Sequence, residues 1–159
     1  MAVGDATAAQ RAAVADSGPV LVYDGVCGLC SASVRFVLRT ERDDSLRFVA
    51  YQSDVGGELL RAYGMDQDTI DSVVYIADGQ AFRRSAAVFA MAGHMRLPWR
   101  LVRVFRIVPG WLRDAVYRLI AKTRYRIFGR RPRCSLPAGR RAAAARDRFL
   151  GEWVAVDGR

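Results

Sequence analysis

The hydrophobic and polar positions in the first two thirds of the chain predict strands and helices in alternation. Short apolar runs rich in β-branched residues indicate strands, and apolar residues three or four positions apart indicate helices. Their order along the chain is β-α-β-α-β-β-α, which predicts an α/β fold with a parallel first pair of strands. The predicted elements are strands over 20–23, 46–50, 72–76 and 81–84, and helices over 31–39, 55–63 and 86–94.

Turn residues support this division. Asp78 and Gly79 both tolerate a positive φ, so they predict a tight hairpin between the third and fourth strands. Ser85 is a residue type that caps helices, and it directly precedes the last helix of the series. A parallel βαβ unit followed by an antiparallel hairpin gives the element order of a thioredoxin-like domain.

The C-terminal third has a different pattern, in which apolar stripes alternate with arginines. Amphipathic helices are predicted over Trp99–Val108 and Trp111–Phe128, with a break at Pro109–Gly110. A last surface helix is predicted over 138–150. These helices extend the α/β domain rather than continue its strand and helix alternation.

The patterns divide the chain into three parts. Residues 1–18 are alanine-rich with few large apolar side chains, so they predict a flexible N-terminal tail. Residues 19–97 are predicted to form the thioredoxin-like domain, and residues 98–159 a basic helical extension packed on it. A chain of 159 residues with 52% hydrophobic content is long enough for one packed core.

The net charge of +9 suggests an anionic partner. The charge is almost entirely arginine, since Lys122 is the only lysine, and it is spread over several segments, so we predict no specific nucleic-acid partner. The segment Trp99–Phe128 has the basic amphipathic pattern of interfacial helices, which leaves a weak contact with anionic membranes as an alternative. We favour the view that both helices pack on the domain and cover its sheet, because a small core needs their apolar faces.

Two cysteines, Cys27 and Cys30, follow the first strand with C-x-x-C spacing, where the strand gives way to a helix. The first turn of a helix has unpaired N–H groups and the positive end of the dipole, and both stabilise a thiolate. A C-x-x-C pair beside a βα unit is typical of a redox dithiol. Because Cys27 is nearer the helix end and the solvent, we predict that it attacks a disulfide and that Cys30 resolves the mixed disulfide.

The segment Tyr23–Cys30, Tyr-Asp-Gly-Val-Cys-Gly-Leu-Cys, resembles the signature of the DCC family of predicted thiol-disulfide oxidoreductases. That family is named for one aspartate and two cysteines. The Asp-Gly hairpin, the Tyr125–Gly129 stretch and Cys134 are similar to further family features, so the resemblance covers about 20–136. It implies a thioredoxin-like fold, a redox dithiol and a motif strand at the centre of the sheet, and it implies little about the substrate.

The resemblance also implies a catalytic role for Asp24. In this interpretation a desolvated Asp24 carboxylate accepts or relays the proton of Cys30 during resolution. In the alternative, Asp24 only accepts backbone N–H bonds in the turn. Gly25 is predicted to supply the tight backbone turn. Cys134, between two prolines, is a candidate accessory thiol, or else a half-buried small side chain.

These residues predict an enzyme, a protein-disulfide or thiol oxidoreductase that needs no metal and no organic cofactor. Its predicted partners are a thiol or disulfide substrate and an external electron donor. Three cysteines and no recognisable secretory signal predict the reducing cytoplasm as its compartment.

Two other kinds of site are weighed against the redox pair. Cys27, Cys30, Cys134 and His94 have the residue types of a Cys₃His zinc site, in which the cysteines would be ligands. An aspartate phosphotransferase would also place a nucleophilic aspartate directly after a strand. The second aspartate expected there is replaced by Val26, so this hypothesis is the weaker one.

Overall fold

The computed structural model describes residues 18–66, 70, 72–129 and 145–150. The strands and helices predicted between residues 20 and 94 are all present, with ends that differ by a few residues. Cys134, the predicted tail and most of the predicted last helix lie outside the described residues. The elements, with η for 3-10 helices, are β1 (Val20–Tyr23), α2 (Gly28–Thr40), β2 (Arg47–Ala50), α3 (Asp54–Ala62), β3 (Val74–Ala77), β4 (Gln80–Arg83), α4 (Arg84–Met91), η1 (Ala92–His94), η2 (Trp99–Ile107), α5 (Gly110–Phe128) and η3 (Arg146–Arg148).

The sheet has four strands in the order β2-β1-β3-β4, so β1 is central, as the resemblance implied. β1 pairs parallel with β2 and antiparallel with β3, and Leu21 lies opposite Phe48 on one side and Tyr75 on the other. The turn between β3 and β4 contains Asp78 and Gly79 with φ of 51° and 71°, which confirms the predicted hairpin. The α/β class and the thioredoxin-like element order are therefore confirmed.

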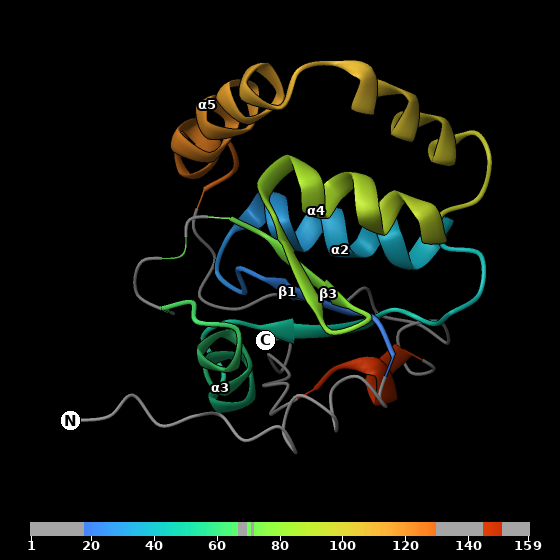
Figure 1. Ribbon diagram of the computed structural model, residues 1–159. Coiled ribbons are helices and arrows are strands. Elements are labelled where there is room, and N and C mark those ends of the chain that lie inside the picture. The colour runs from blue at the N-terminus through green and yellow to red at the C-terminus, as the bar shows by residue number, and fades with distance from the viewer. Residues whose placement is uncertain (1–17, 67–69, 71, 130–144, 151–159) are drawn as a thin grey trace.

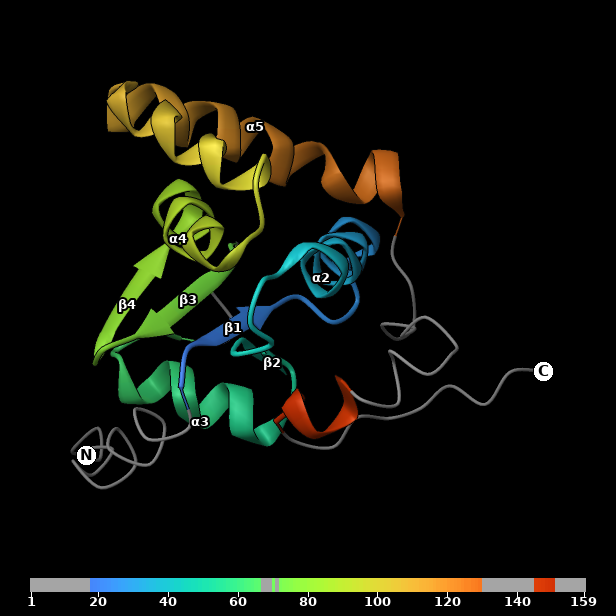
Figure 2. The ribbon, with the colours of Figure 1, turned by 90° about the vertical axis from the view of Figure 1, so that its right-hand side faces the viewer.

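Both faces of the sheet are covered by helices. Side chains alternate along β1, so Leu21 and Tyr23 join one hydrophobic cluster, while Val20 and Val22 join another on the opposite face. Helices α2 and α4 cover the first face, and α3 lies on the other (Figures 1 and 2). The turn after β1, an interior strand, thus connects to the start of α2 between the layers of helices.

The 3-10 helix η2 and helix α5 lie outside α2 and α4, one layer further from the sheet (Figure 2). The expectation that they cover the sheet is wrong, because α2 and α4 already occupy that face. Helix α5 is instead held by polar groups: the Ser85 hydroxyl donates to Asp114, and the Tyr117 hydroxyl accepts the Val73 N–H at 3.0 Å. Ser85 therefore does not cap α4, whose N-cap is Arg83.

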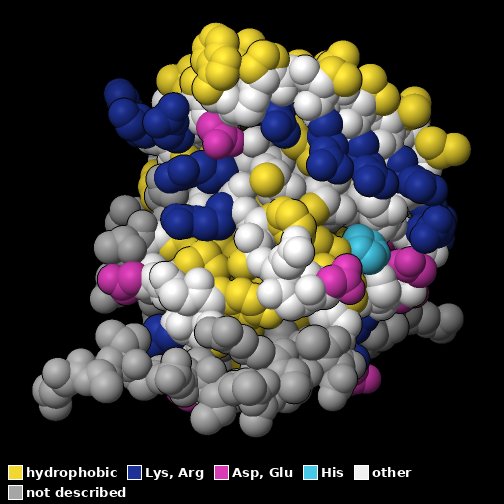
Figure 3. Space-filling view, in the orientation of Figure 1, with side chains coloured by type: hydrophobic (Ala, Val, Ile, Leu, Met, Phe, Trp, Pro, Cys, Tyr) yellow, Lys and Arg dark blue, Asp and Glu magenta, His cyan; other side chains and the backbone are white. Residues whose placement is uncertain are grey.

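The apolar stripe predicted for α5 faces outward. Ile107, at the end of η2, is 84% exposed, and Trp111 is 72% exposed. Figure 3 shows hydrophobic side chains gathered along one edge of the molecule, above a row of Lys and Arg side chains. None of the helices in the described part of the chain is both long and apolar enough to span a bilayer. The exposed large apolar residues of this region are Leu97, Trp99, Leu101, Val104, Phe105, Ile107, Trp111, Leu112, Val116, Leu119, Ile120, Ile127 and Phe128.

Substitutions of a buried and an exposed phenylalanine test whether the apolar face of η2 and α5 is exposed. Phe48 is fully buried and stacks on Phe149, with ring centroids 5.2 Å apart, whereas Phe105 is 62% exposed. We expect Phe48→Ala to lower the free energy of unfolding by about 3–5 kcal/mol, because it leaves a cavity in the core. Phe105→Ala should change it by less than about 0.5 kcal/mol. Urea denaturation followed by circular dichroism measures both, and a large loss for Phe105→Ala would mean that its face is covered.

Candidate functional site

The turn between β1 and α2 brings the two motif cysteines together at the start of the helix. Cys27 is the N-cap of α2, and its sulfur accepts a hydrogen bond from the backbone N–H of Cys30 at 3.5 Å. The Cys27 carbonyl accepts the N–H and the hydroxyl of Ser31 at 3.0 and 3.1 Å. Both cysteines are free thiols. A sulfur at this place faces helical N–H donors, and no acidic residue lies in the first turn to oppose a thiolate.

The two thiols differ in exposure, and in the opposite sense to the sequence-based expectation. Cys27 is 0% exposed and Cys30 is half-buried, so the prediction that Cys27 lies nearer the solvent is wrong. The end of α5 packs on the first turn of α2, directly after Cys27. The Gly28 N–H donates to the Gly129 carbonyl at 3.4 Å, and a Cβ at Gly28 would overlap the Phe128 carbonyl oxygen.

Asp24 is buried directly after β1, and one carboxylate oxygen organises the turn. Its Oδ1 accepts the Val26 N–H at 3.0 Å and the Gln52 amide at 2.7 Å. The Gln52 carbonyl oxygen in turn accepts the Gly25 N–H at 2.9 Å. Gly25 has no Cβ to fill this narrow space: one would lie 3.1 Å from the Gln52 oxygen and 3.2 Å from the Ala50 Cβ.

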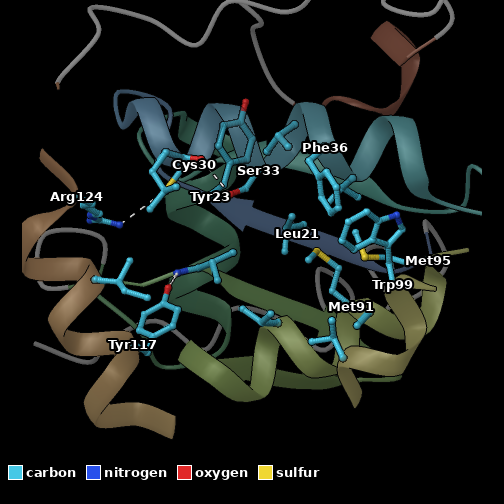
Figure 4. Close-up of a pocket in the computed structure, with 18 of the residues that line it drawn as sticks. Leu21, Tyr23, Cys30, Ser33, Phe36, Met91, Met95, Trp99, Tyr117 and Arg124 are labelled. Carbon is cyan, nitrogen blue, oxygen red and sulfur yellow. Dashed lines mark hydrogen bonds between the residues drawn. The ribbon is translucent and has the colours of Figure 1, made fainter. Parts of the chain in front are cut away.

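The other carboxylate oxygen of Asp24 binds two residues of α5 that the sequence analysis did not assign to the site. Asp24 Oδ2 accepts the Tyr125 hydroxyl and lies 3.3 Å from Nη2 of Arg124. The same guanidinium donates from Nη1 to the Cys30 sulfur at 3.7 Å, and Figure 4 shows Arg124 directed at Cys30. Arg124 thus lies between the carboxylate and the thiol and contacts both.

Burial controls the protonation of this cluster. Burial, and next the neighbouring Cys27, raise the pKa of the Cys30 thiol to about 12, and Arg124 only partly opposes them. Burial and the hydrogen bond to Asp24 raise the pKa of Tyr125. At neutral pH Cys30 is therefore a thiol and Tyr125 a phenol.

The proposed zinc site gains no support. Within residues 18–66, 70, 72–129 and 145–150, no three His, Cys, Asp or Glu side chains are grouped so that they could hold a metal ion. His94 instead lies with Nε2 2.8 Å from the Tyr75 hydroxyl and Nδ1 3.1 Å from the Ser45 hydroxyl. Cys134 lies outside the described residues.

Comparison with known proteins identifies the family. Residues 21–130 match the model of the DCC1-like thiol-disulfide oxidoreductases. The chain belongs to this family. Cys27, Cys30 and Asp24 all lie within the matched residues, as do Arg124 and Tyr125. The recognition of the DCC family from the C-x-x-C segment is confirmed, and thiol-disulfide chemistry is the activity that the family name suggests.

Two relatives of this DCC-family chain are similar over most of their length. The uncharacterized protein YuxK of Bacillus subtilis is 43% identical over 119 residues, which are 75% of this chain and 87% of that protein. A chloroplastic DCC family protein of Arabidopsis thaliana is 37% identical over 122 residues, 76% of this chain and 71% of that one. No solved structure matches. With one relative named as chloroplastic, the cytoplasmic compartment stays a prediction.

The raised pKa of Cys30 predicts how its alkylation depends on pH. We expect the rate of Cys30 modification by iodoacetamide in the reduced protein to keep rising up to pH 10 without a plateau, because its pKa of about 12 keeps the thiolate fraction low. In urea the rate should instead follow the ordinary thiol pKa of 9.0, with its midpoint at that pH and a plateau above it. Peptide mass spectrometry distinguishes Cys30 from the other cysteines. A plateau near neutral pH in the folded protein would mean that Arg124 outweighs burial.

Proposed function

We propose that this DCC-family protein is a thiol-disulfide oxidoreductase whose pair Cys27 and Cys30 cycles between a dithiol and a disulfide. The main support is the position of both cysteines at the start of α2, where the Cys30 N–H donates to the Cys27 sulfur. Sulfurs of residues i and i+3 at a helix start are a frequent arrangement for redox dithiols. The substrates are thiols or disulfides, and an external thiol donor supplies electrons.

In the proposed reaction, the Cys27 thiolate attacks one sulfur of a substrate disulfide, and the other substrate sulfur leaves as a thiolate. Cys30 then loses its proton and attacks the Cys27 sulfur of the mixed disulfide. The second substrate thiolate leaves, and the Cys27–Cys30 disulfide forms, so two electrons pass to the substrate. The end of α5 has to move from Gly28 to open Cys27 to a substrate, since Cys27 is buried.

Arg124 and Asp24 assist the second step in this proposal. As Cys30 loses its proton, Nη1 of Arg124 donates to the sulfur and stabilises the growing negative charge. Asp24 holds the guanidinium in place through Nη2. Because Arg124 lies between the carboxylate and the Cys30 sulfur, we assign Asp24 a positioning role in preference to the role of proton acceptor or relay that the family resemblance implied.

We infer a second function, in which the outer face of η2 and α5 docks on an anionic membrane surface. Support comes from its large exposed apolar side chains, such as Phe105 and Trp111, because exposed apolar surface rimmed by polar residues often marks an interaction site. Residues 99–128 contain eight Arg and Lys and a single acid, Asp114. Apolar residues flanked by arginines fit the boundary between acyl chains and anionic headgroups.

The redox proposal predicts a reversible two-electron transition of the pair. In graded dithiothreitol buffers, quenched by alkylation and read by mass, we expect two thiols to be lost together, and Cys134→Ser should leave this transition intact. With a small disulfide, Cys30→Ser should accumulate a mixed disulfide on Cys27, and Cys27→Ser should abolish turnover. A pair that never oxidises in any of these buffers contradicts the proposed function.

The membrane proposal predicts sedimentation with vesicles that contain phosphatidylglycerol and not with pure phosphatidylcholine vesicles. Binding should weaken as salt rises, because the arginine contacts are screened. Replacing two of the exposed aromatics, Phe105→Ser with Trp111→Ser, should reduce binding several-fold, whereas Val55→Ser, at an exposed apolar position on α3, should not. Absence of binding to these vesicles at low salt would contradict the membrane proposal. If analytical ultracentrifugation instead shows a dimer that forms as the protein concentration rises, the apolar face binds a second copy of the chain.

A further inference from the structure

A cavity of about 280 Å³ lies between α2, α4, η2 and α5 and ends at Cys30. Figure 4 shows Cys30 and Arg124 at one end and Phe36, Trp99 and Met95 at the other. Cys30 belongs to the lining, whereas Cys27 does not. Cys30 is therefore the sulfur of the pair that a molecule in the cavity would meet.

The lining selects apolar ligands. Of the nineteen described residues that line the cavity, Arg124 alone carries a charge, and that charge is already paired with Asp24. Two of the polar lining groups are engaged as well: the Ser33 hydroxyl donates to the Leu29 carbonyl, and the Tyr117 hydroxyl accepts the Val73 N–H. A charged ligand such as glutathione would lose its hydration here without gaining partners for its carboxylates.

The cavity is large enough for a small organic molecule and reaches the surface. An engineered apolar cavity of about 150 Å³ binds benzene, so a volume of 280 Å³ has room for a substituted ring or a short aliphatic chain. Phe36, Trp99 and Ile120 line the cavity and are also exposed, so they form its mouth. Phe36 and Trp99 make an edge-to-face contact with ring centroids 4.8 Å apart.

We propose that this cavity binds the apolar body of a small dithiol, which reduces the oxidised pair by attack on the Cys30 sulfur. The inference rests on the proposed redox function and names the chemical class of its electron donor. Cys27, outside the cavity lining, then reacts with the substrate disulfide, and Cys30, in the cavity, reacts with the donor. The two half-reactions use different sulfurs because the two sulfurs face different surroundings.

The reducing half-reaction balances as two exchanges. A thiolate of the donor attacks the Cys30 sulfur, the Cys27–Cys30 bond breaks, and Cys27 leaves as a thiolate, which the helix start and the Cys30 N–H stabilise. The second donor thiol loses its proton and attacks the donor sulfur bound to Cys30. Cys30 leaves with the electron pair, next to Nη1 of Arg124, and takes up a proton. The donor ends as a cyclic disulfide, and two electrons have passed to the protein.

Two dithiols that differ in their carbon bodies test the inference. Dihydrolipoamide carries an aliphatic chain, dithiothreitol carries two hydroxyls, and both close to a cyclic disulfide. We expect the ratio of their rate constants for reducing the oxidised protein to favour dihydrolipoamide. Ala121→Phe, which fills the cavity, should lower this ratio by about tenfold, the size of effect that a lost methylene contact has in an apolar pocket. Ala115→Phe, at an exposed position on the same helix, should leave the ratio unchanged.

Octanamide, an aliphatic amide without sulfur, provides a readout that needs no variant. It should slow reduction of the wild-type protein by dihydrolipoamide competitively. A ratio that stays unchanged in Ala121→Phe and in a second filled variant, Val102→Phe, together with no competition by octanamide, overturns the inference while the redox function stands. If neither dithiol reduces the Cys27–Cys30 disulfide, both the proposed redox function and the inference about the cavity fail. Failure of the inference alone is therefore distinguishable from failure of the function.

Discussion

The buried ion pair between Asp24 and Arg124 joins the turn after β1 to helix α5 beside the cysteines. Removing one partner of a buried pair leaves a charge without compensation, which typically costs about 3–5 kcal/mol. Tyr125 and Gln52 satisfy the remaining bonds of the carboxylate, so the pair is also held in one geometry. This contact holds α5, which walls the cavity, beside the turn that carries both thiols.

Much of the fold follows from local sequence patterns. The four buried residues of β1, the C-x-x-C spacing and the Asp78–Gly79 turn each determine a feature through their own chemistry, and each was predicted within a few residues. Ser85 shows where local chemistry is insufficient. Its hydroxyl can cap a helix, but a carboxylate from α5 lies within reach, and which partner it binds depends on a helix distant in sequence.

The site was only partly predictable for the same reason. Asp24, Cys27 and Cys30 are adjacent in sequence, whereas Arg124 and Gln52 reach them from other elements. The apolar stripe of α5 predicted a buried face, yet that stripe points outward, and the polar side chains of Asp114, Tyr117 and Arg124 bind the rest of the protein. One pattern could have indicated this: Tyr117, Ala121 and Arg124 follow helical spacing on the face that lines the cavity. Hydrophobic periodicity separates the two faces of a helix. It does not show which face contacts the rest of the protein when those contacts are made by polar groups.

The inverted orientation of α5 connects the proposals made for this protein. Its inner face holds Arg124 against Asp24 and walls the cavity that leads to Cys30, and its end packs on Gly28, next to Cys27. Its outer face carries the apolar residues proposed to bind a membrane surface. Any force that shifts α5 therefore acts on both sulfurs at once, since the ion pair transmits the shift to the turn that carries them. An apolar donor that arrives from a bilayer would meet the mouth of the cavity on the same side, at Trp99 and Ile120, which belong both to the exposed face and to the lining.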